Sequence, residues 1–259
     1  MPRRGVAIRA AAVLAGLVFV TGCTLTPDPT ASPSPEPSVS SPAPSETPSS
    51  PPQIDAITID SPPDGARVPV PVSANGTANT FEAALTVDVM NEANEILCVR
   101  HVLATSGSGT RGTWQARLGF APQRDTDEPV TLRAYELSAS DGSMTNLVER
   151  PLTLSPEHPP IFLTSPVCGD VVAAGGAMSV QGLATVFEAA LTVEVRDAAG
   201  AAVFSRNMMT AEGGVESPFG EFITIPADLP AGFYDLVAFN YSAKDGNIEN
   251  EFPVQIEVR

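Results

Sequence analysis

Lysine, histidine and tryptophan are scarce in this sequence of 259 residues, and each shortage excludes a class of function. Lys244 is the single lysine, and 30 acidic residues face 14 basic ones, which gives a formal net charge of −16. Such a chain offers no basic patch, and its negative field repels nucleic-acid phosphates and anionic lipid headgroups. We therefore expect no nucleic-acid partner.

The two histidines, His101 and His158, have no second His, Cys or acid at metal-ligand spacing, so we expect no metal and no cofactor. The acidic segment Asp125–Glu128 could offer oxygens to calcium, but no EF-hand Glu follows it, and it is interpreted as a solvated loop. The sequence also lacks a Gly-x-Ser-x-Gly elbow and a Gly-rich phosphate loop. We expect a protein that is not an enzyme.

Long apolar runs are absent as well. Residues 10–20 form an apolar run of about 11 residues, whereas a membrane-spanning helix needs about 20. Three arginines precede this run, and Val20-Thr21-Gly22-Cys23 ends it. A basic start, a short apolar middle and small residues before a cleavage point predict a secretory signal peptide over residues 1–22.

Val20-Thr21-Gly22-Cys23 resembles the lipobox of bacterial lipoproteins. The resemblance implies that the Cys23 thiol receives a diacylglycerol with palmitate-type chains, and that cleavage makes Cys23 the first residue. Two or more acyl chains anchor a protein stably, because each buried methylene contributes about 0.8 kcal/mol. We expect a lipid-anchored protein on the extracytoplasmic face of the cell membrane.

Residues 23–53 combine the lipidated Cys23 with a Pro/Ser-rich segment that has no apolar periodicity. This composition cannot bury a core and predicts a disordered, semi-rigid linker. Thirty residues of extended chain reach at most about 90 Å, at about 3.1 Å per residue. The linker would hold the folded part away from the membrane.

An internal repeat dominates the rest of the chain. The segment Phe81–Val87 recurs without change as Phe187–Val193, and other landmarks recur in the same order. They are Ser61-Pro62 with Ser165-Pro166, Gly76 with Gly182, and Asp141-Gly142 with Asp245-Gly246. A period above 100 residues indicates tandem domains rather than a solenoid. The proline-rich linker near residue 156 predicts domains over residues 54–156 and 157–259.

Each copy shows apolar residues at every second position, as half-buried strands do. The strands carry the following apolar sets: Leu85, Val87 and Val89; Leu191, Val193 and Val195; Trp114, Ala116, Leu118 and Phe120; Val254, Ile256 and Val258. Turn pairs such as Asp-Gly fall between them, and no long segment has helical spacing. About seven short strands in about 100 residues predict an all-β fold of two tandem immunoglobulin-like antiparallel β-sandwiches.

These landmarks resemble the bacterial spore-germination immunoglobulin-like domain, the second type in the Gmad series. The pattern consists of an early Ser-Pro, a Gly before Phe-Glu-Ala, and a late Ser-Ala-x-Asp-Gly-x-x-Glu, which the second copy matches at Ser242–Glu249. The resemblance covers about 200 residues and implies an extracellular domain often found in lipoproteins. The partner domain that often accompanies it in germination proteins is missing, so a link with germination is left open.

Four residues of the repeat, Glu82, Glu188, Asp141 and Asp245, have two interpretations. Either they are ligand contacts presented twice, or they are structural carboxylates that accept backbone N–H bonds in turns. We prefer the structural interpretation, in which Glu82 and Glu188 lie beside buried Phe81 and Phe187, and the aspartates lie before Gly142 and Gly246.

Cys98 and Cys168 are the two cysteines that follow Cys23. An even pair in an oxidising compartment suggests a disulfide, which would join the two domains because the positions are not equivalent in the repeats. Two separate thiols remain the alternative. The repeat partner of Cys98 is Phe204, and alternation does not settle on which face Cys98 lies.

The main functional hypothesis is a non-enzymatic envelope lipoprotein that presents loops, or an exposed strand edge, to an unknown envelope protein or to the wall polymer. The alternative is a ligand- or glycan-binding lipoprotein that assists transport or a wall enzyme, with a link to sporulation or germination. Glycan sites need exposed aromatic platforms, and the candidates are few: Trp114, Tyr135, Tyr234 and Tyr241.

Overall fold

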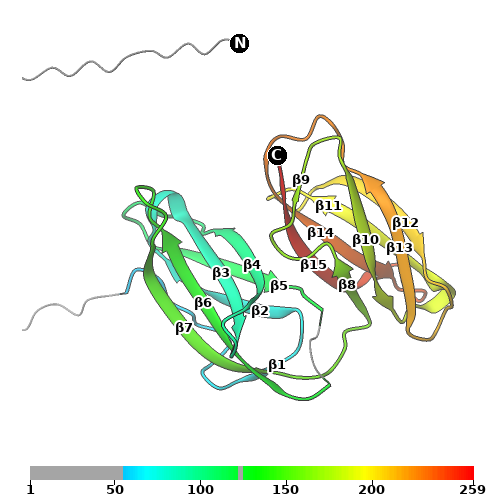
Figure 1. Cartoon of the computed structure of the whole chain (residues 1–259), viewed down its shortest axis with the longest axis horizontal. Coiled ribbons are helices and arrows are strands. Elements are labelled where there is room, and N and C mark those ends of the chain that lie inside the picture. The colour runs from blue at the N-terminus through cyan, green and yellow to red at the C-terminus, as the bar shows by residue number, and fades with distance from the viewer. Residues whose placement is uncertain (1–54, 122–124) are drawn as a thin grey trace, which may run out of the picture. The chain divides into compact units, whose positions relative to one another are not determined.

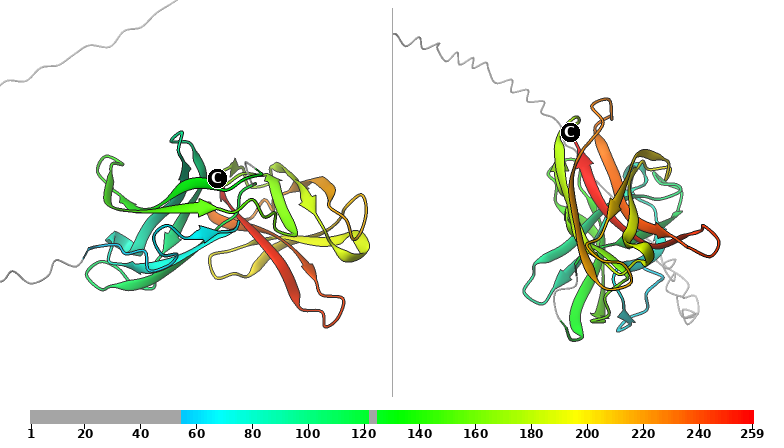
Figure 2. Two further views of the ribbon diagram at one scale, coloured as in Figure 1. Left: turned by 90° about the horizontal axis from the view of Figure 1, so that it is seen from below. Right: turned by 90° about the vertical axis from the view of Figure 1, so that its right-hand side faces the viewer.

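The computed structural model describes residues 55–121 and 125–259, and these residues form two β-sandwiches (Figures 1 and 2). The first contains β1 (Arg67–Val68), β2 (Val72–Ala78), β3 (Ala84–Asn91), β4 (Ile96–Leu103), β5 (Gly112–Leu118), β6 (Glu128–Leu137) and β7 (Met144–Leu154). The second contains β8 (Ile161–Ser165), β9 (Val171–Val172), β10 (Ala177–Ala184), β11 (Ala190–Arg196), β12 (Ala202–Met209), β13 (Ser217–Thr224), β14 (Gly232–Tyr241) and β15 (Ile248–Val258).

Each sandwich pairs a five-stranded sheet with a smaller one. In the first domain the large sheet has the order β1-β7-β6-β3-β4, and β2 pairs with β5. In the second domain the large sheet has the order β12-β11-β14-β15-β9, and the small sheet is β13-β10-β8. Strands pair antiparallel except at the short edge strands β1 and β9, which run parallel to β7 and β15. The predicted tandem immunoglobulin-like architecture is confirmed.

The cores consist of the residues that alternation places inside. Leu85, Val87 and Val89 on β3 are buried, as are their counterparts Leu191, Val193 and Val195 on β11. Their outward neighbours Thr86 and Asp88 are also buried, and the Asp88 carboxylate bonds to Arg133 and Tyr135 of the same sheet. The two cores form one continuous apolar cluster.

Gly76 and Gly182, the matching glycines of the repeat, lie where another backbone segment approaches closely. A Cβ at Gly76 would collide with the carbonyl of Thr58, and one at Gly182 with the carbonyl of Phe162. The opening segment of each domain therefore packs directly on a glycine, which explains why both copies keep it.

Two short 3₁₀ turns precede the central strands, η1 (Phe81–Ala83) before β3 and η2 (Phe187–Ala189) before β11. No helix among residues 55–121 and 125–259 is long and apolar enough to cross a membrane.

Candidate interaction site

A disulfide joins the two domains. Cys98 on β4 is bonded to Cys168, which lies between β8 and β9, with the Cα atoms 4.9 Å apart. The sequence left this bond open, and the structure shows it as a link between domains rather than within one. Cys98 is buried, in a position where the second domain has Phe204.

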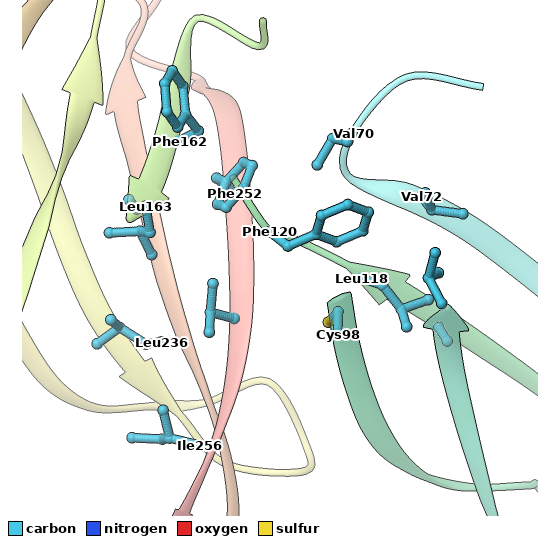
Figure 3. Close-up of a cluster of buried hydrophobic side chains, with 14 of the residues drawn as sticks. Val70, Val72, Cys98, Leu118, Phe120, Phe162, Leu163, Leu236, Phe252 and Ile256 are labelled. Atoms are coloured by element: carbon cyan, nitrogen blue, oxygen red, sulfur yellow. The ribbon is translucent and has the colours of Figure 1, made fainter. Parts of the chain in front are cut away.

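Apolar contacts surround this link. In Figure 3 Phe120 and Val70 of the first domain lie on the side that faces Phe252 of the second. All three side chains are buried. The neighbouring Gly119 has no room for a Cβ, because the carbonyl of Pro253 in the second domain occupies that position. Residues 52–259 accordingly form one compact unit.

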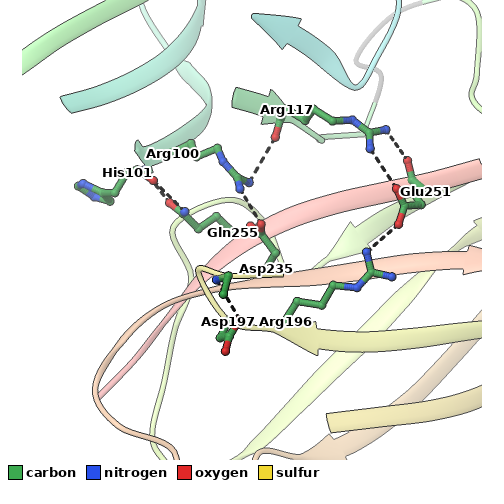
Figure 4. A network of polar contacts seen from close by, with 9 residues as sticks. Arg100, His101, Arg117, Arg196, Asp197, Asp235, Glu251 and Gln255 are labelled. Carbon is green, nitrogen blue, oxygen red and sulfur yellow. Dashed lines mark hydrogen bonds and ion pairs between the residues drawn. The ribbon is translucent and has the colours of Figure 1, made fainter. Parts of the chain in front are cut away.

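Polar contacts extend this interface (Figure 4). Arg100 Nη2 donates to Asp235 Oδ2 at 2.6 Å, and both side chains are at most one-quarter exposed. The Glu251 carboxylate accepts a hydrogen bond from Arg196 of its own domain at 2.6 Å, and its backbone carbonyl accepts one from Arg117 of the first domain at 2.9 Å. These charge-assisted bonds are stronger than neutral ones.

The edge of β4 is closed at one point by a side chain of the second domain. Gln255 Oε1 accepts the His101 backbone N–H at 2.6 Å, and Gln255 Nε2 donates to the His101 carbonyl at 3.0 Å. This amide therefore replaces a neighbouring strand at His101. The expected exposed edge is thus partly occupied within the chain itself.

The imidazole of His101 stacks on the ring of Phe233, with ring centroids 4.1 Å apart. Burial lowers the pKa of His101 below its ordinary value, although Glu257 acts in the opposite direction. His158 lies 3.6 Å from a carboxylate oxygen of Glu216. In the described part of the chain no three His, Cys, Asp or Glu residues are grouped as metal ligands would be.

The Phe-Glu-Ala motif departs from expectation in both domains. Phe81 and Phe187 are 62% and 71% exposed, so the prediction that they are buried is wrong. Glu82 and Glu188 have φ values of 53° and 59°, and the alanines that follow are also left-handed. Two consecutive non-glycine residues in this region cost roughly 1–2 kcal/mol each, and the turn they form directs the Phe ring outward.

The neighbouring loop holds this turn in place. In the first domain the Glu82 N–H donates to Ser108 Oγ at 3.0 Å, and a Cβ on Gly107 would collide with Ala83. The Phe81 N–H donates to a carboxylate oxygen of Glu136 at 2.8 Å. The structural interpretation requires that the Glu82 and Glu188 carboxylates accept backbone N–H bonds. Among the described residues, none donates a hydrogen bond to either carboxylate.

A groove of about 660 Å³ lies between the domains next to the first of these turns. Its walls come from the η1 turn, β3, β4 and the end of β6 in the first domain, and from the β11–β12 turn and β14 in the second. The apolar members of the lining are Phe81, Ala84, Leu85, Val102, Leu103, Leu137, Ala139, Ala198 and Phe233. The charged members of the lining are Glu82, Arg100, Glu136, Asp197 and Asp235. The imidazole of His101 also lines the groove.

Exposed apolar residues form a row across the first domain's large sheet. Leu103 pairs with Ala84, Leu137 pairs with Met144, and the Thr86–Tyr135 pairing puts Ala84 and Leu137 at the same level. We call these four residues the first apolar row. Three of them line the groove.

The second domain repeats this row at equivalent positions. Met209 pairs with Ala190, Tyr241 pairs with Ile248, and the Thr192–Phe239 pairing brings the two pairs level. We call these four residues the second apolar row. The large side chains of both rows and the two motif phenylalanines are 45% to 71% exposed. Sequence alternation did not reveal the rows, because single exposed apolar residues are common on any surface.

The repeated aspartates do take part in turns. Asp141 accepts the Ser143 N–H at 3.1 Å, and Asp245 accepts the Asn247 N–H at 3.2 Å. Gly142 and Gly246 follow with φ values of 72° and 73°. Hydrogen bonds, first from Ser138, lower the pKa of Asp141, and the Asn247 N–H lowers that of Asp245.

The acidic segment after residue 124 has its own partners. Asp127 accepts a hydrogen bond from Arg67 Nε at 3.0 Å, and Glu128 begins β6 as a buried residue.

Of the four aromatic candidates for a glycan platform, Tyr241 alone is exposed, and the other three, Trp114, Tyr135 and Tyr234, are buried. The coplanar exposed platform that glycan binding would need is not formed by these four.

Three predictions lie outside the described residues, namely the signal peptide over 1–22, the lipidated Cys23 and the linker over 23–53.

The structure adds three residues that sequence reasoning missed, Asp235, Glu251 and Gln255. Each contacts the first domain from the second. The first domain has Thr131, Leu147 and Pro151 at the matching positions, and that difference between the copies was the available signal.

The family model for the immunoglobulin-like domain of bacterial spore germination matches residues 56–143 and 160–247. Among solved structures the chain is similar to fibronectin(III)-like modules of Clostridium thermocellum CbhA (16% identity, 78% of this chain and 94% of that chain, TM-score 0.25). It is also similar to the Ig1-2 module of the Drosophila receptor protein tyrosine phosphatase DLAR (13% identity, 78% and 98%, TM-score 0.22). No curated protein matches the sequence.

Proposed function

Because the chain belongs to the family of immunoglobulin-like domains of bacterial spore germination, which it contains twice in tandem, we propose that it is a non-enzymatic, lipid-anchored envelope protein that binds a segment of a partner protein. Tandem domains of this fold form a protein-interaction module. The proposed binding site is the groove between the domains.

The observation that carries this proposal is the groove itself. It combines about 660 Å³ of volume with exposed apolar side chains at its rim, and a disulfide holds its two walls together. Pockets that bind ligands are concave, mostly apolar and largely preformed. A fixed groove also lowers the conformational cost of binding, because its walls need no ordering when a segment enters.

The occupant we propose is a protein segment, because the lining favours apolar contact at several separated points. Phe81, Leu103 and Leu137 each expose a large side chain toward solvent. A sugar would instead need an aromatic platform, and the buried Trp114 and Tyr135 do not provide one. The glycan-binding alternative is therefore disfavoured.

Site-specific photo-crosslinking in intact cells tests the groove. A photoreactive residue replaces Leu103 in the groove or, as a control, Phe222 on β13, which is 73% exposed on the small sheet. We expect one envelope protein to be crosslinked from position 103 and not from 222, and we expect Phe81→Ala to reduce that product. An identical set of products from both positions would rule out the groove as the site.

The lipid anchor is the second part of the proposal. It rests on the basic start, the short apolar run and the small residues before Cys23. With Cys23→Ser we expect the lipid to disappear from the mature N-terminus in mass spectrometry, and the protein to leave the membrane fraction. A membrane fraction that retains the serine variant would contradict the anchor.

A further inference from the structure

The second apolar row (Met209, Ala190, Tyr241 and Ile248) lies on the large sheet of the second domain, at the end where the η2 turn exposes Phe187. It occupies the same positions as the first row, three of whose four residues line the interdomain groove. No described residue of the first domain covers it, since Met209 is 64% and Tyr241 is 55% exposed.

The rows agree in size as well as in place. Leu103 corresponds to Met209, Leu137 to Tyr241, and Met144 to Ile248, and each pair exchanges one large apolar side chain for another. Tyr241 is also supported from below, because its ring packs edge to face on the buried Phe239 with centroids 5.3 Å apart. A contiguous apolar patch on a charged protein marks an interaction surface.

Carboxylates lie at the same end of the second domain as the second row. Glu188 belongs to the η2 turn, Glu212 lies in the loop that packs against that turn, and Glu249 follows Ile248 of the row in β15. All three are exposed, and within the described residues none of them makes an ion pair. Asp245 and Lys244 lie in the adjoining β14–β15 turn, so this end of the second domain carries four of these acidic groups and one lysine.

We infer that the second apolar row is a separate docking surface for a partner-protein segment whose apolar side chains are flanked by Lys or Arg. The inference rests on the proposed function for the class of partner and adds its charge and a second site. Basic flanks complement the four carboxylates and speed association. Anionic lipid would be repelled, and a second copy of this chain would bring the same carboxylates face to face.

Calorimetric titration with two synthetic peptides tests the inference on the whole soluble chain carrying Cys23→Ser. Each peptide has about 12 residues and alternates Leu with either Lys or Glu, so that its extended length of roughly 40 Å spans a sheet. We expect the Leu/Lys peptide to bind at two sites per chain, and the Leu/Glu peptide at none. Binding should weaken at about 1 M salt, where the screening length is only about 3 Å.

Variants assign the two sites. Met209→Ser with Tyr241→Ser should weaken one site by about tenfold or more and leave the other unchanged. Leu103→Ser with Leu137→Ser should do the reverse. Phe222→Ala removes a ring from the small sheet that is more exposed than any of these four side chains, and it should change neither site. Because all of these side chains are exposed, folding is expected to persist, which circular dichroism checks.

Other outcomes overturn the inference. Binding at one site that only the Leu103 and Leu137 changes abolish would leave the groove as the single site and refute the second surface. Equal binding of the Leu/Glu peptide would refute the basic partner. Concentration-dependent dimerisation in sedimentation, lost in the Met209 and Tyr241 variant, would show that the occupant is a second copy. Loss of all peptide binding would contradict the proposed function as well.

Discussion

At the scale of single residues, a buried ion pair between neighbouring strands stabilises the first domain's large sheet. Asp88 accepts two hydrogen bonds from Arg133 at 2.7 Å each and one from Tyr135 at 3.0 Å. The Asp88 side chain is fully buried, and that of Arg133 is 11% exposed. Burial, followed by Asp88, raises the pKa of Tyr135 to about 12.

Asp88→Asn should destabilise the protein by about 3 kcal/mol, because Arg133 would lose its counter-charge while remaining mostly buried. Urea unfolding measures the loss. The matched control is Asp127→Asn, which removes the half-exposed pair with Arg67 and should cost no more than about 1 kcal/mol. Equal effects of the two changes would contradict the role assigned to burial.

His101 makes the interface sensitive to pH. Its pKa in the folded protein lies below the ordinary 6.5, so the unfolded chain binds more protons between the two values. Stability contributed by neutral His101 is therefore complete above pH 6.5 and is lost as the pH falls from 6.5 through the folded value. Glu257 is the charged neighbour that opposes this shift.

Thermal unfolding between about pH 7.5 and 5 should show this loss in the wild type and a smaller one in His101→Gln, which cannot titrate in that range. His158→Gln is the control, because its ring contacts Glu216 and Phe162 and makes none of the contacts described for His101. If His101→Gln followed the wild-type pH profile, another group would be responsible.

At the scale of elements, the η1 and η2 turns are the most unusual part of the fold. Ala83 has φ 60° and Ala189 has φ 57°, in the region that glycine tolerates best. Both copies nevertheless have Phe-Glu-Ala there. A sequence rule that favours glycine or asparagine at such positions gives no signal for this turn, which explains why its Phe was wrongly predicted to be buried.

Ala83→Gly should stabilise the protein by about 0.5 kcal/mol, because relief of roughly 1–2 kcal/mol of left-handed strain exceeds the added entropy of the unfolded chain. The same substitution at Ala116, buried in β5, should destabilise by about 1 kcal/mol. Urea unfolding of both variants compares the signs directly. Destabilisation by Ala83→Gly would show that the turn is not strained.

At the scale of the whole molecule, the disulfide, the apolar contact at Phe120 and the Gln255 and Glu251 hydrogen bonds join two domains into one unit. The sequence predicted the domain boundary near residue 156 and left the disulfide open. The disulfide closes a loop with a sequence separation of 70 residues and so restricts the unfolded chain substantially.

Replacing Cys98 and Cys168 together by serine should lower the free energy of unfolding by about 2–4 kcal/mol. Urea unfolding under non-reducing conditions measures it, and the wild type in excess dithiothreitol should behave like the double variant. Peptide binding in the groove should weaken in the same variant while binding to the second apolar row is retained. If neither the double serine variant nor the reduced wild type lost stability, the disulfide would not contribute to the free energy of unfolding.

The sequence by itself determined the all-β class, the tandem repeat, the core faces and the family. Period-two alternation and turn residues are local properties of the chain, and both copies of the repeat show them. The tertiary structure decided which exposed side chains become neighbours. Leu103, Leu137 and Phe81 come from three separate segments, and only sheet register and the η1 turn bring them together. It also decided that Cys98 bonds to Cys168 and that Gln255 closes the edge of β4, since contacts between domains depend on docking and leave no periodic trace in either domain.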